Sequence, residues 1–243
     1  MTIITMAIIG LITGFVLDEL IARMAREPYE RGELEDDDLR LKKHGGTSLE
    51  LNSETGALAM PGLLTTASAY RRITVIAATV GIFALLGRQY AGDDAHLAIV
   101  SFYAAVLIIC TGTDVLAYRV PNAVTYPAII LALVIGMVLP GANRLEVVAG
   151  GLLFGGLLFV PSILTGGGMG MGDVKLAFFV GLALGLTLVV PAMLVMAISG
   201  GLAAAILLAT RLRGKGDPIP YAPFIAGGML VVMLLSGTAF TSL

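Results

Sequence analysis

The sequence predicts an all-α fold, a polytopic membrane helix bundle of about eight transmembrane helices. Of its 243 residues, 57% are hydrophobic and 13% are charged, and the mean hydropathy is +0.94. A soluble domain of this length would need far more polar surface to cover itself. Unpaired backbone groups are costly in lipid, and the apolar stretches are too long and continuous for barrel strands, so helices are expected.

The individual spans follow from the length of the apolar stretches, because each crossing of a bilayer needs roughly 20 mainly apolar residues. The expected spans are about 3–22, 73–90, 97–113, 123–140, 145–165, 173–187, 188–209 and 222–241. The sixth is short, and its border with the seventh carries no clear signal. The first lacks a basic segment before it and is followed by arginines, which predicts an uncleaved helix rather than a secretory signal.

The chain divides into three regions by polarity. Residues 1–22 form the first transmembrane helix, 23–72 a polar loop, and 73–243 the main membrane domain. An acidic run at 33–38 and a mixture of Gly, Ser, Thr and Asn predict that the loop is solvated and partly flexible.

The distribution of basic residues predicts the topology, because cytoplasmic loops of membrane proteins carry an excess of Lys and Arg. Thirteen of the fifteen basic residues fall in the odd-numbered connections, and only Arg88 and Arg144 fall in the even-numbered ones. The odd connections are therefore expected in the cytoplasm and both termini outside. This arrangement puts Asp114 and Asp173, at the third and fifth connections, on the same cytoplasmic side.

Several function classes are disfavoured by composition. No basic face or tail dominates, so nucleic acid is not an expected partner. The single cysteine, Cys110, excludes a disulfide framework and a cysteine zinc site. His44 and His96 lie in polar connections, where we expect them to be solvated, and there is no His-Glu-x-x-His sequence. We therefore expect no metal and no cofactor.

Carboxylates next to apolar spans are candidates for function, because each costs roughly 2.5 to 3.5 kcal/mol at a helix centre on insertion scales. Four such residues are present: Asp18, Glu19, Asp114 and Asp173. Asp18 and Glu19 are expected at the membrane interface beside Arg23, as second-line candidates.

Asp114 ends the third span and is followed, seven residues later, by Pro121-Asn122. Proline at this position is typical of a helix start. Taken alone, Asp114 is equally consistent with a loop carboxylate paired with Arg119. The second carboxylate makes a catalytic role the better interpretation.

Asp173 follows a glycine-rich run that extends from Gly166 to Gly172. Such backbone can leave helical geometry and approach a ligand closely. The alternative is a connector in which Asp173 is the N-cap of the sixth helix, a position that Asp fills well. A phosphate-binding loop is a poor match, since the run lacks the Gly-Lys-Ser/Thr ending and a preceding strand.

The pair suits peptide-bond hydrolysis. Two close aspartates share one proton, so the ionised one can activate a water while the protonated one donates to the carbonyl oxygen. No histidine within a span is available to serve a serine or cysteine nucleophile. An aspartic peptidase is therefore the expected activity.

The glycine-rich site resembles a known motif. Gly170-Met-Gly172-Asp173-Val-Lys175-Leu is similar to the second catalytic motif of the prepilin peptidases, which are membrane aspartic proteases of the Gly-x-Gly-Asp type. Preflagellin peptidases and, more distantly, presenilin-like enzymes share this motif.

Two further segments resemble the same family, and the resemblance covers about residues 97–241. Asp114 with Pro121-Asn122 is similar to the first catalytic motif, and the segment 220–227 to the opening of the last helix. By resemblance, Asp114 and Asp173 are the catalytic pair. Gly170, Gly172, Lys175, Pro121 and Asn122 support them.

The resemblance implies an enzyme of the bacterial inner membrane that cleaves the leader from type IV prepilins or pseudopilins at the cytoplasmic face. Its partners would be the prepilin helix and the lipid bilayer. Which aspartate is the base and the oligomeric state do not follow. The acidic run at 33–38 could attract a basic leader, or simply form a solubilising face.

The first cytoplasmic loop departs from the family pattern. In many members it holds two zinc-binding Cys-x-x-Cys pairs and belongs to a domain that methylates the new N-terminus. The loop at 23–72 has no cysteine, so we expect a peptidase without methyl transfer.

Two other classes compete with the peptidase. An ion- or proton-coupled transporter would also use membrane carboxylates and glycine-broken helices, but it predicts paired breaks, and no second glycine-rich run matches 166–172. A membrane scaffold is the other alternative, since Gly151-x-x-x-Gly155 and Gly181-x-x-x-Gly185 are typical of helix packing. We assign these four glycines to packing.

Overall fold

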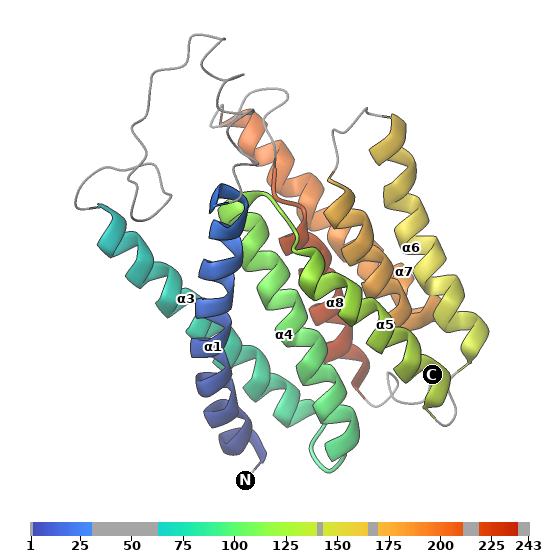
Figure 1. Cartoon of the computed structure of the whole chain (residues 1–243). Coiled ribbons are helices and arrows are strands. Elements are labelled where there is room, and N and C mark those ends of the chain that lie inside the picture. Colours follow the sequence, from blue (N-terminus) through green and yellow to red (C-terminus); the bar gives the residue numbers. More distant parts are fainter. Residues whose placement is uncertain (1, 31–62, 140–142, 165–169, 211–218, 238–243) are drawn as a thin grey trace.

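The computed structural model describes residues 2–30, 63–139, 143–164, 170–210 and 219–237. These residues form seven helices, shown in Figure 1, and contain no strand. The helices are α1 (Thr2–Glu30), α3 (Leu63–Gln89), α4 (Asp94–Ala117), α5 (Asn122–Val138), α6 (Arg144–Leu164), α7 (Met171–Ala209) and α8 (Ala222–Ser236). The predicted all-α fold class is confirmed.

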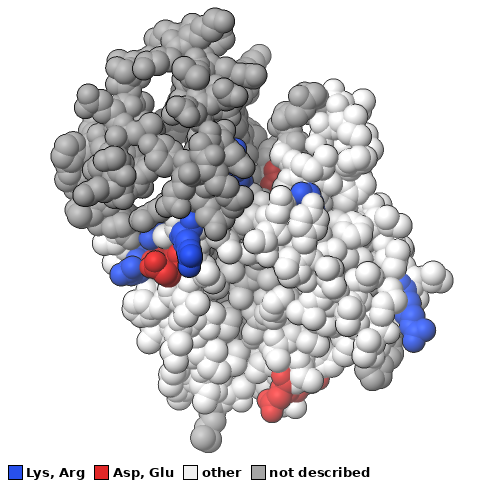
Figure 2. All heavy atoms as spheres, in the orientation of Figure 1, with Lys and Arg blue, Asp and Glu red and all other residues white. Residues whose placement is uncertain are grey.

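Most helices suit a membrane. By length and composition, α1, α3, α4, α6 and α7 could each cross a bilayer, while α5 and α8 are apolar but shorter. On the described surface in Figure 2, charged side chains gather towards the ends of the helices and the area between them is uncharged. The chain is a helical membrane protein; the number of eight spans stays a prediction.

The predicted polar loop is shorter than expected at both ends. Helix α1 runs on to Glu30, and α3 already begins at Leu63, so both helices extend beyond the predicted region boundaries at 22 and 72, which stay predictions. Hydropathy marks where the apolar stretch ends, whereas Arg, Glu, Ala and Leu continue a helix readily beyond it. The acidic run at 33–38 and His44 lie outside the described residues.

Helix α7 is broken at Gly185, whose φ of 68° and ψ of 173° are not helical. Asp173 lies near the end of α4 that carries Asp114, and Gly185 lies beside Glu146 in the first turn of α6. Further along α7, Gly200 lies near Phe224 of α8. Phe224 is two residues after Ala222, which bonds to Asp114, so this part of α7 is back at the Asp114 end of the bundle. The chain therefore reverses at Gly185, near the predicted border of the sixth and seventh spans, and Figure 1 shows the orange ribbon of α7 turning back.

The first and last described helices meet at one end of the bundle. The start of α1 packs beside Gly87 near the end of α3, and Gly237, just after α8, lies against Gln89. This end is opposite to the one that holds Asp114, which lies in the last turn of α4. The first described helix therefore begins, and the last one ends, at the same end of the bundle. An even number of crossings requires this arrangement.

Glycines bring α6 and α7 into close contact. A Cβ on Gly151 or Gly155 would meet the side chains of Leu182 or Phe178, and a Cβ on Gly181 would meet the backbone of α6. These three glycines pack helices as predicted. Gly185 does not serve close packing of its own Cα, because a Cβ there would have room. Glycine is needed at 185 for the positive φ of its backbone.

Replacing Gly185 by alanine is expected to destabilise the fold. Its backbone region is essentially restricted to glycine, so an alanine there costs about 1 to 3 kcal/mol. We expect a lower midpoint of thermal unfolding in detergent for Gly185→Ala. Gly156→Ala is the control: it lies inside α6 with nothing within 4 Å of the added carbon, and its midpoint should stay equal or rise. Equal midpoints for both variants would contradict the role of Gly185.

Candidate active site

Asp114 lies inside the bundle in the last turn of α4. Its side chain is 5% exposed, and its carbonyl oxygen accepts the N–H of Tyr118, which ends the helix in a left-handed conformation with φ of 50°. The next segment is extended, because Val120 precedes Pro121 and the helical region is disfavoured before proline. Asp114 is therefore part of a helix. The alternative interpretation of the sequence, in which it is a loop carboxylate, was wrong.

The Asp114 carboxylate is held by the beginning of α8. Its Oδ2 accepts the backbone N–H of Ala222 at 3.0 Å, and the N–H of Tyr221 also interacts with it. Pro223 lies in the first turn of α8, where a fixed φ and a missing N–H are compatible with the helix. The amino end of α8 is thus directed at this carboxylate.

Asp173 lies in the first turn of α7 and is 7% exposed. The N-cap of α7 is Gly170, so the interpretation of Asp173 as the N-cap was wrong; its own N–H donates to the Gly170 carbonyl at 3.1 Å. Its Oδ1 is buried and has no hydrogen-bond partner among the described residues. An unpaired buried carboxyl oxygen is costly and marks a place where a ligand or a water could bind.

The structure brings the two aspartates together, as the sequence predicted. The Asp114 carboxyl group is close enough to act electrostatically on Asp173. Where the two segments meet, a Cβ on Gly172 would lie 2.9 Å from the Cβ of Val120. Glycine at 172 therefore allows the start of α7 to approach the α4–α5 connection. Gly170 has no such contact, since its Cβ would meet only Asp173 Oδ2 at 3.5 Å and a neighbouring backbone nitrogen.

Lys175 and Asn122 join the same two segments from the other side of α7. The Lys175 Nζ donates to Asn122 Oδ1 at 2.9 Å and lies 4.7 Å from the ring centroid of Tyr126. Asn122 is the first residue of α5, and Pro121 is its N-cap, so the predicted helix start is confirmed. This bridge fixes the first turn of α7 relative to the first turn of α5.

The second-line carboxylates are not part of this site. Asp18 is 1% exposed, and its carboxylate accepts from Arg71 Nε at 2.8 Å and Arg72 Nε at 3.1 Å. The expected neighbour was Arg23, but α3 begins early enough to bring its own arginines alongside α1. Glu19 is exposed. Asp18 joins α1 to α3, since a buried carboxylate needs partners of this kind.

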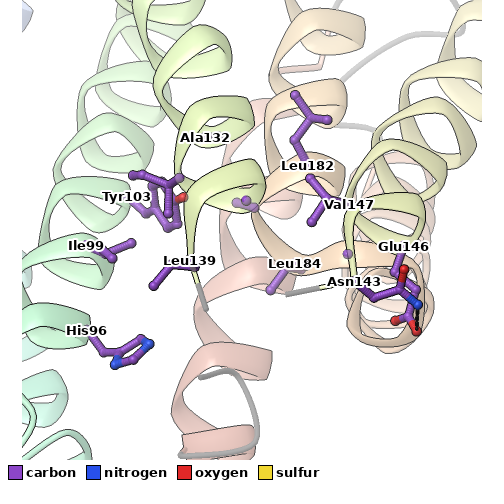
Figure 3. A pocket seen from close by; sticks show the side chains of 14 residues that line it. His96, Ile99, Tyr103, Ala132, Leu139, Asn143, Glu146, Val147, Leu182 and Leu184 are labelled. Atoms are coloured by element: carbon purple, nitrogen blue, oxygen red, sulfur yellow. Dashed lines mark hydrogen bonds between the residues drawn. The ribbon is translucent and has the colours of Figure 1, made fainter. Parts of the chain in front are cut away.

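A cavity of about 40 Å³ lies at the other end of the bundle, next to Gly185 (Figure 3). It is lined by His96 from α4 and Glu146 from α6. His96 is not in a solvated connection as predicted: it lies in α4, is largely buried, and its Nδ1 is 2.6 Å from Asp93 Oδ2. Glu146 accepts a hydrogen bond from Thr187. These groups are partnered, so the aspartate pair is the better candidate site.

No metal site is evident at either end. Among the residues that the structure describes, no three His, Cys, Asp or Glu side chains gather as ligands would. Cys110 is buried one turn before Asp114 and is not in a disulfide.

Fold and site define a class, the helical membrane proteins that bury a pair of aspartates near one end of the bundle. Comparison with known proteins narrows this class. Residues 101–208 match the sequence model of the type IV leader peptidase family and contain both Asp114 and Asp173. This segment of the chain is therefore similar to the type IV leader peptidase family.

A named relative agrees with the family. The prepilin leader peptidase/N-methyltransferase of Bacillus subtilis (strain 168) is 30% identical to the chain over 159 residues. The match covers 64% of this chain and 62% of the relative, so the chain spans less than two thirds of the relative's length. No solved structure matches the chain significantly.

The sequence did not predict the backbone donors and packing contacts of the site. The N–H groups of Tyr221 and Ala222 and the contact of Val120 with Gly172 were not predicted, since backbone donors and packing contacts carry no residue signature. The proline-rich segment at 220–223 was the available signal, because it marks where a helix begins and hence where free N–H groups point.

The contact between Gly172 and Val120 predicts a non-additive pair of variants. Gly172→Ala should cost about 1 to 3 kcal/mol of stability, since inserting a carbon into a packed contact forces a shift. In a Val120→Gly background the same change should cost less, because the Cβ and Cγ2 of Val120 that the added carbon would meet are gone. A double-mutant cycle of unfolding free energies measures this difference. Equal costs in both backgrounds would show that the contact does not require glycine.

Proposed function

We propose that the chain is a membrane aspartic endopeptidase that removes the leader from type IV prepilins or pseudopilins, without transferring a methyl group. The observation that carries the proposal is the approach of two buried carboxyl groups, Asp114 and Asp173, from helices far apart in sequence. Their position inside the segment that matches the leader peptidase family supports this activity.

The pair can hydrolyse a peptide bond with one shared proton. The ionised carboxylate takes a proton from a water molecule, whose oxygen attacks the carbonyl carbon, and the protonated carboxyl group donates to the carbonyl oxygen. In the tetrahedral intermediate the C–N bond then breaks. The leaving nitrogen receives the proton that came from water, and a hydroxyl proton returns to the second carboxyl group. The pair ends in its starting state.

The position of the pair suits a substrate that is itself a membrane helix. Asp114 is in the last turn of one helix and Asp173 in the first turn of another. Both therefore lie near one end of the bundle, where a polar leader would join the apolar helix of a prepilin. We place this end at the cytoplasmic face of the bacterial inner membrane and both termini outside, because thirteen of the fifteen basic residues fall on that side in the predicted topology.

The regions of the chain take different roles in this proposal. Residues 73–243 carry the peptidase, 1–22 anchor the first helix, and 23–72 occupy the place of the family's methylation domain. The absence of cysteine from 23–72 is the reason to propose no methyl transfer. The acidic run at 33–38 is proposed to attract the basic leader through charge.

A transporter is not favoured by these observations. It predicted a second break in a helix that would help to build a substrate path. The break at Gly185 exists, but it joins two antiparallel segments at the end of the bundle opposite to the carboxylates. It therefore contributes nothing to a shared site with Asp114 and Asp173.

Leader cleavage by the purified chain tests the proposal. Candidate prepilins from the same genome are incubated with the protein in liposomes, and the shortened product is separated from the precursor. Asp114→Asn and Asp173→Asn, tested separately, should each lower the cleavage rate about 10²- to 10⁴-fold, the usual contribution of a general acid or base. Glu146→Gln, a carboxylate at the opposite end, should cut like the parent.

The proposal is wrong if the folded parent cuts no candidate, or if either asparagine variant cuts as well as the parent. Circular dichroism and size-exclusion profiles that match the parent establish that the variants are folded.

The absence of methyl transfer is tested in the same preparation. Cleaved pilin is incubated with the protein and S-adenosylmethionine, and the mass of its amino terminus is measured. We expect no increase. A methylated product that depends on the chain would contradict this part of the proposal and leave the peptidase part standing.

A further inference from the structure

The two aspartates have different surroundings. Asp114 Oδ2 accepts the Ala222 N–H at 3.0 Å in a buried position, with the Tyr221 N–H beside it. Asp173 Oδ1 is equally buried and has no hydrogen-bond partner among the described residues. One carboxyl group therefore faces backbone donors, and the other lacks them at its buried oxygen.

This difference favours a negative charge on Asp114. Backbone N–H groups donate and cannot accept, so they stabilise the ionised carboxylate, and hydrogen bonds to a charged group are about twice as strong as neutral ones. A buried oxygen without donors is poorly suited to a negative charge but tolerates a protonated carboxyl group. Since the two groups repel each other when both are ionised, the shared proton belongs on Asp173.

Helix dipoles act in the opposite direction and are weaker here. Asp114 is in the last turn of α4, where a negative charge is disfavoured, and Asp173 is in the first turn of α7, where it is favoured. At Asp114, however, the amino end of α8 offsets the carboxyl end of α4. The Ala222 N–H at hydrogen-bond distance, with the Tyr221 N–H beside it, outweighs the remaining dipole of α7.

We propose that Asp114 is the water-activating base, that Asp173 is the acid, and that the amino end of α8, at Tyr221 and Ala222, is the positioning element that sets this assignment. The inference rests on the proposed peptidase function for its chemical meaning. In the hydrolysis, Asp114 takes the proton of the attacking water as the new C–O bond forms, and Asp173 gives its proton to the carbonyl oxygen. When the C–N bond breaks, Asp114 returns its proton to the leaving nitrogen, and Asp173 recovers one from the intermediate's hydroxyl.

Infrared spectroscopy of the unmodified sequence tests the assignment. Cell-free synthesis with a suppressor tRNA places aspartate labelled with ¹³C in its carboxyl group at position 114 in one sample and at 173 in another. At neutral pH in deuterated buffer, the band of a protonated carboxyl group should move to lower wavenumber in the 173-labelled sample only. A shift in the 114-labelled sample, in both or in neither overturns the assignment.

This experiment needs no substrate, so it succeeds or fails independently of leader cleavage. Failure to cut any prepilin would refute the proposed function, while the infrared result would still report which carboxyl group holds the proton.

A backbone ester tests the role of α8. Lactic acid in place of Ala222 converts the donating N–H into an oxygen and leaves the side chain unchanged. Lactic acid in place of Ala226, one turn further along α8, is the control, since that N–H is directed along the helix. The ester at 222 should lower kcat by at least about tenfold, the usual loss for a hydrogen bond to a charged group, with KM unchanged. The ester at 226 should leave both constants within about twofold.

Two outcomes overturn the positioning role. Equal kcat for the two esters shows that the Ala222 N–H does nothing specific, and a change in KM alone shows that the amino end of α8 serves substrate binding. If the 222 ester does not fold, the isotope experiment still decides the assignment, because it changes no bond.

Discussion

Two buried carboxyl groups in an apolar bundle repel each other when both are ionised, and the rest of the fold has to hold them close enough to share one proton. Three contacts achieve this near the site. Gly172 lets the start of α7 reach Val120, Lys175 bonds to Asn122, and the amino end of α8 holds Asp114. None of these contacts is strong alone, so the free energy that keeps the two carboxyl groups close and buried comes mainly from helix packing over the whole bundle. The Gly-x-Gly-Asp sequence is thus a packing requirement as much as a chemical one, and its second glycine carries the steric part.

The other buried or half-buried charged groups show how the bundle compensates a charge that has only a structural role. Asp18 is as deeply buried as the candidate pair, yet two arginines of α3 neutralise it. His96 is paired with Asp93, and Glu146 with Thr187. A buried carboxyl group without such compensation is unusual in a membrane bundle. Asp173 is such a group, since its Oδ1 has no hydrogen-bond partner among the described residues. Pairing with arginine therefore distinguishes Asp18 from the two candidate catalytic aspartates more clearly than burial does.

Much of this could be read from the sequence, and the failures have common causes. Hydropathy predicted the helical class, and the aspartates were found because carboxylates beside apolar spans are rare. The proline at 121 gave a correct helix start. The helices extend beyond the predicted boundaries at 22 and 72, because hydropathy follows lipid contact whereas a helix continues through backbone hydrogen bonds. The N-cap of α7 was misplaced by three residues, since glycine and aspartate both suit that position. Gly185 was assigned to packing because the Gly-x-x-x-Gly spacing of the sequence does not reveal the backbone angles of a single glycine.

The reversal at Gly185 connects the two ends of the molecule. If the chain continued straight after Gly185, α8 would begin at the end of the bundle away from Asp114, and its N–H groups could not reach that carboxylate. The turn occurs where Gly150 packs directly against the backbone of Gly185 and Leu186, so that a side chain at 150 has no space. A glycine contact at one end of the bundle thereby determines which helix terminus faces the aspartate at the other. The charge state of the candidate site thus depends on the topology of the whole bundle, and a local sequence motif could not specify it.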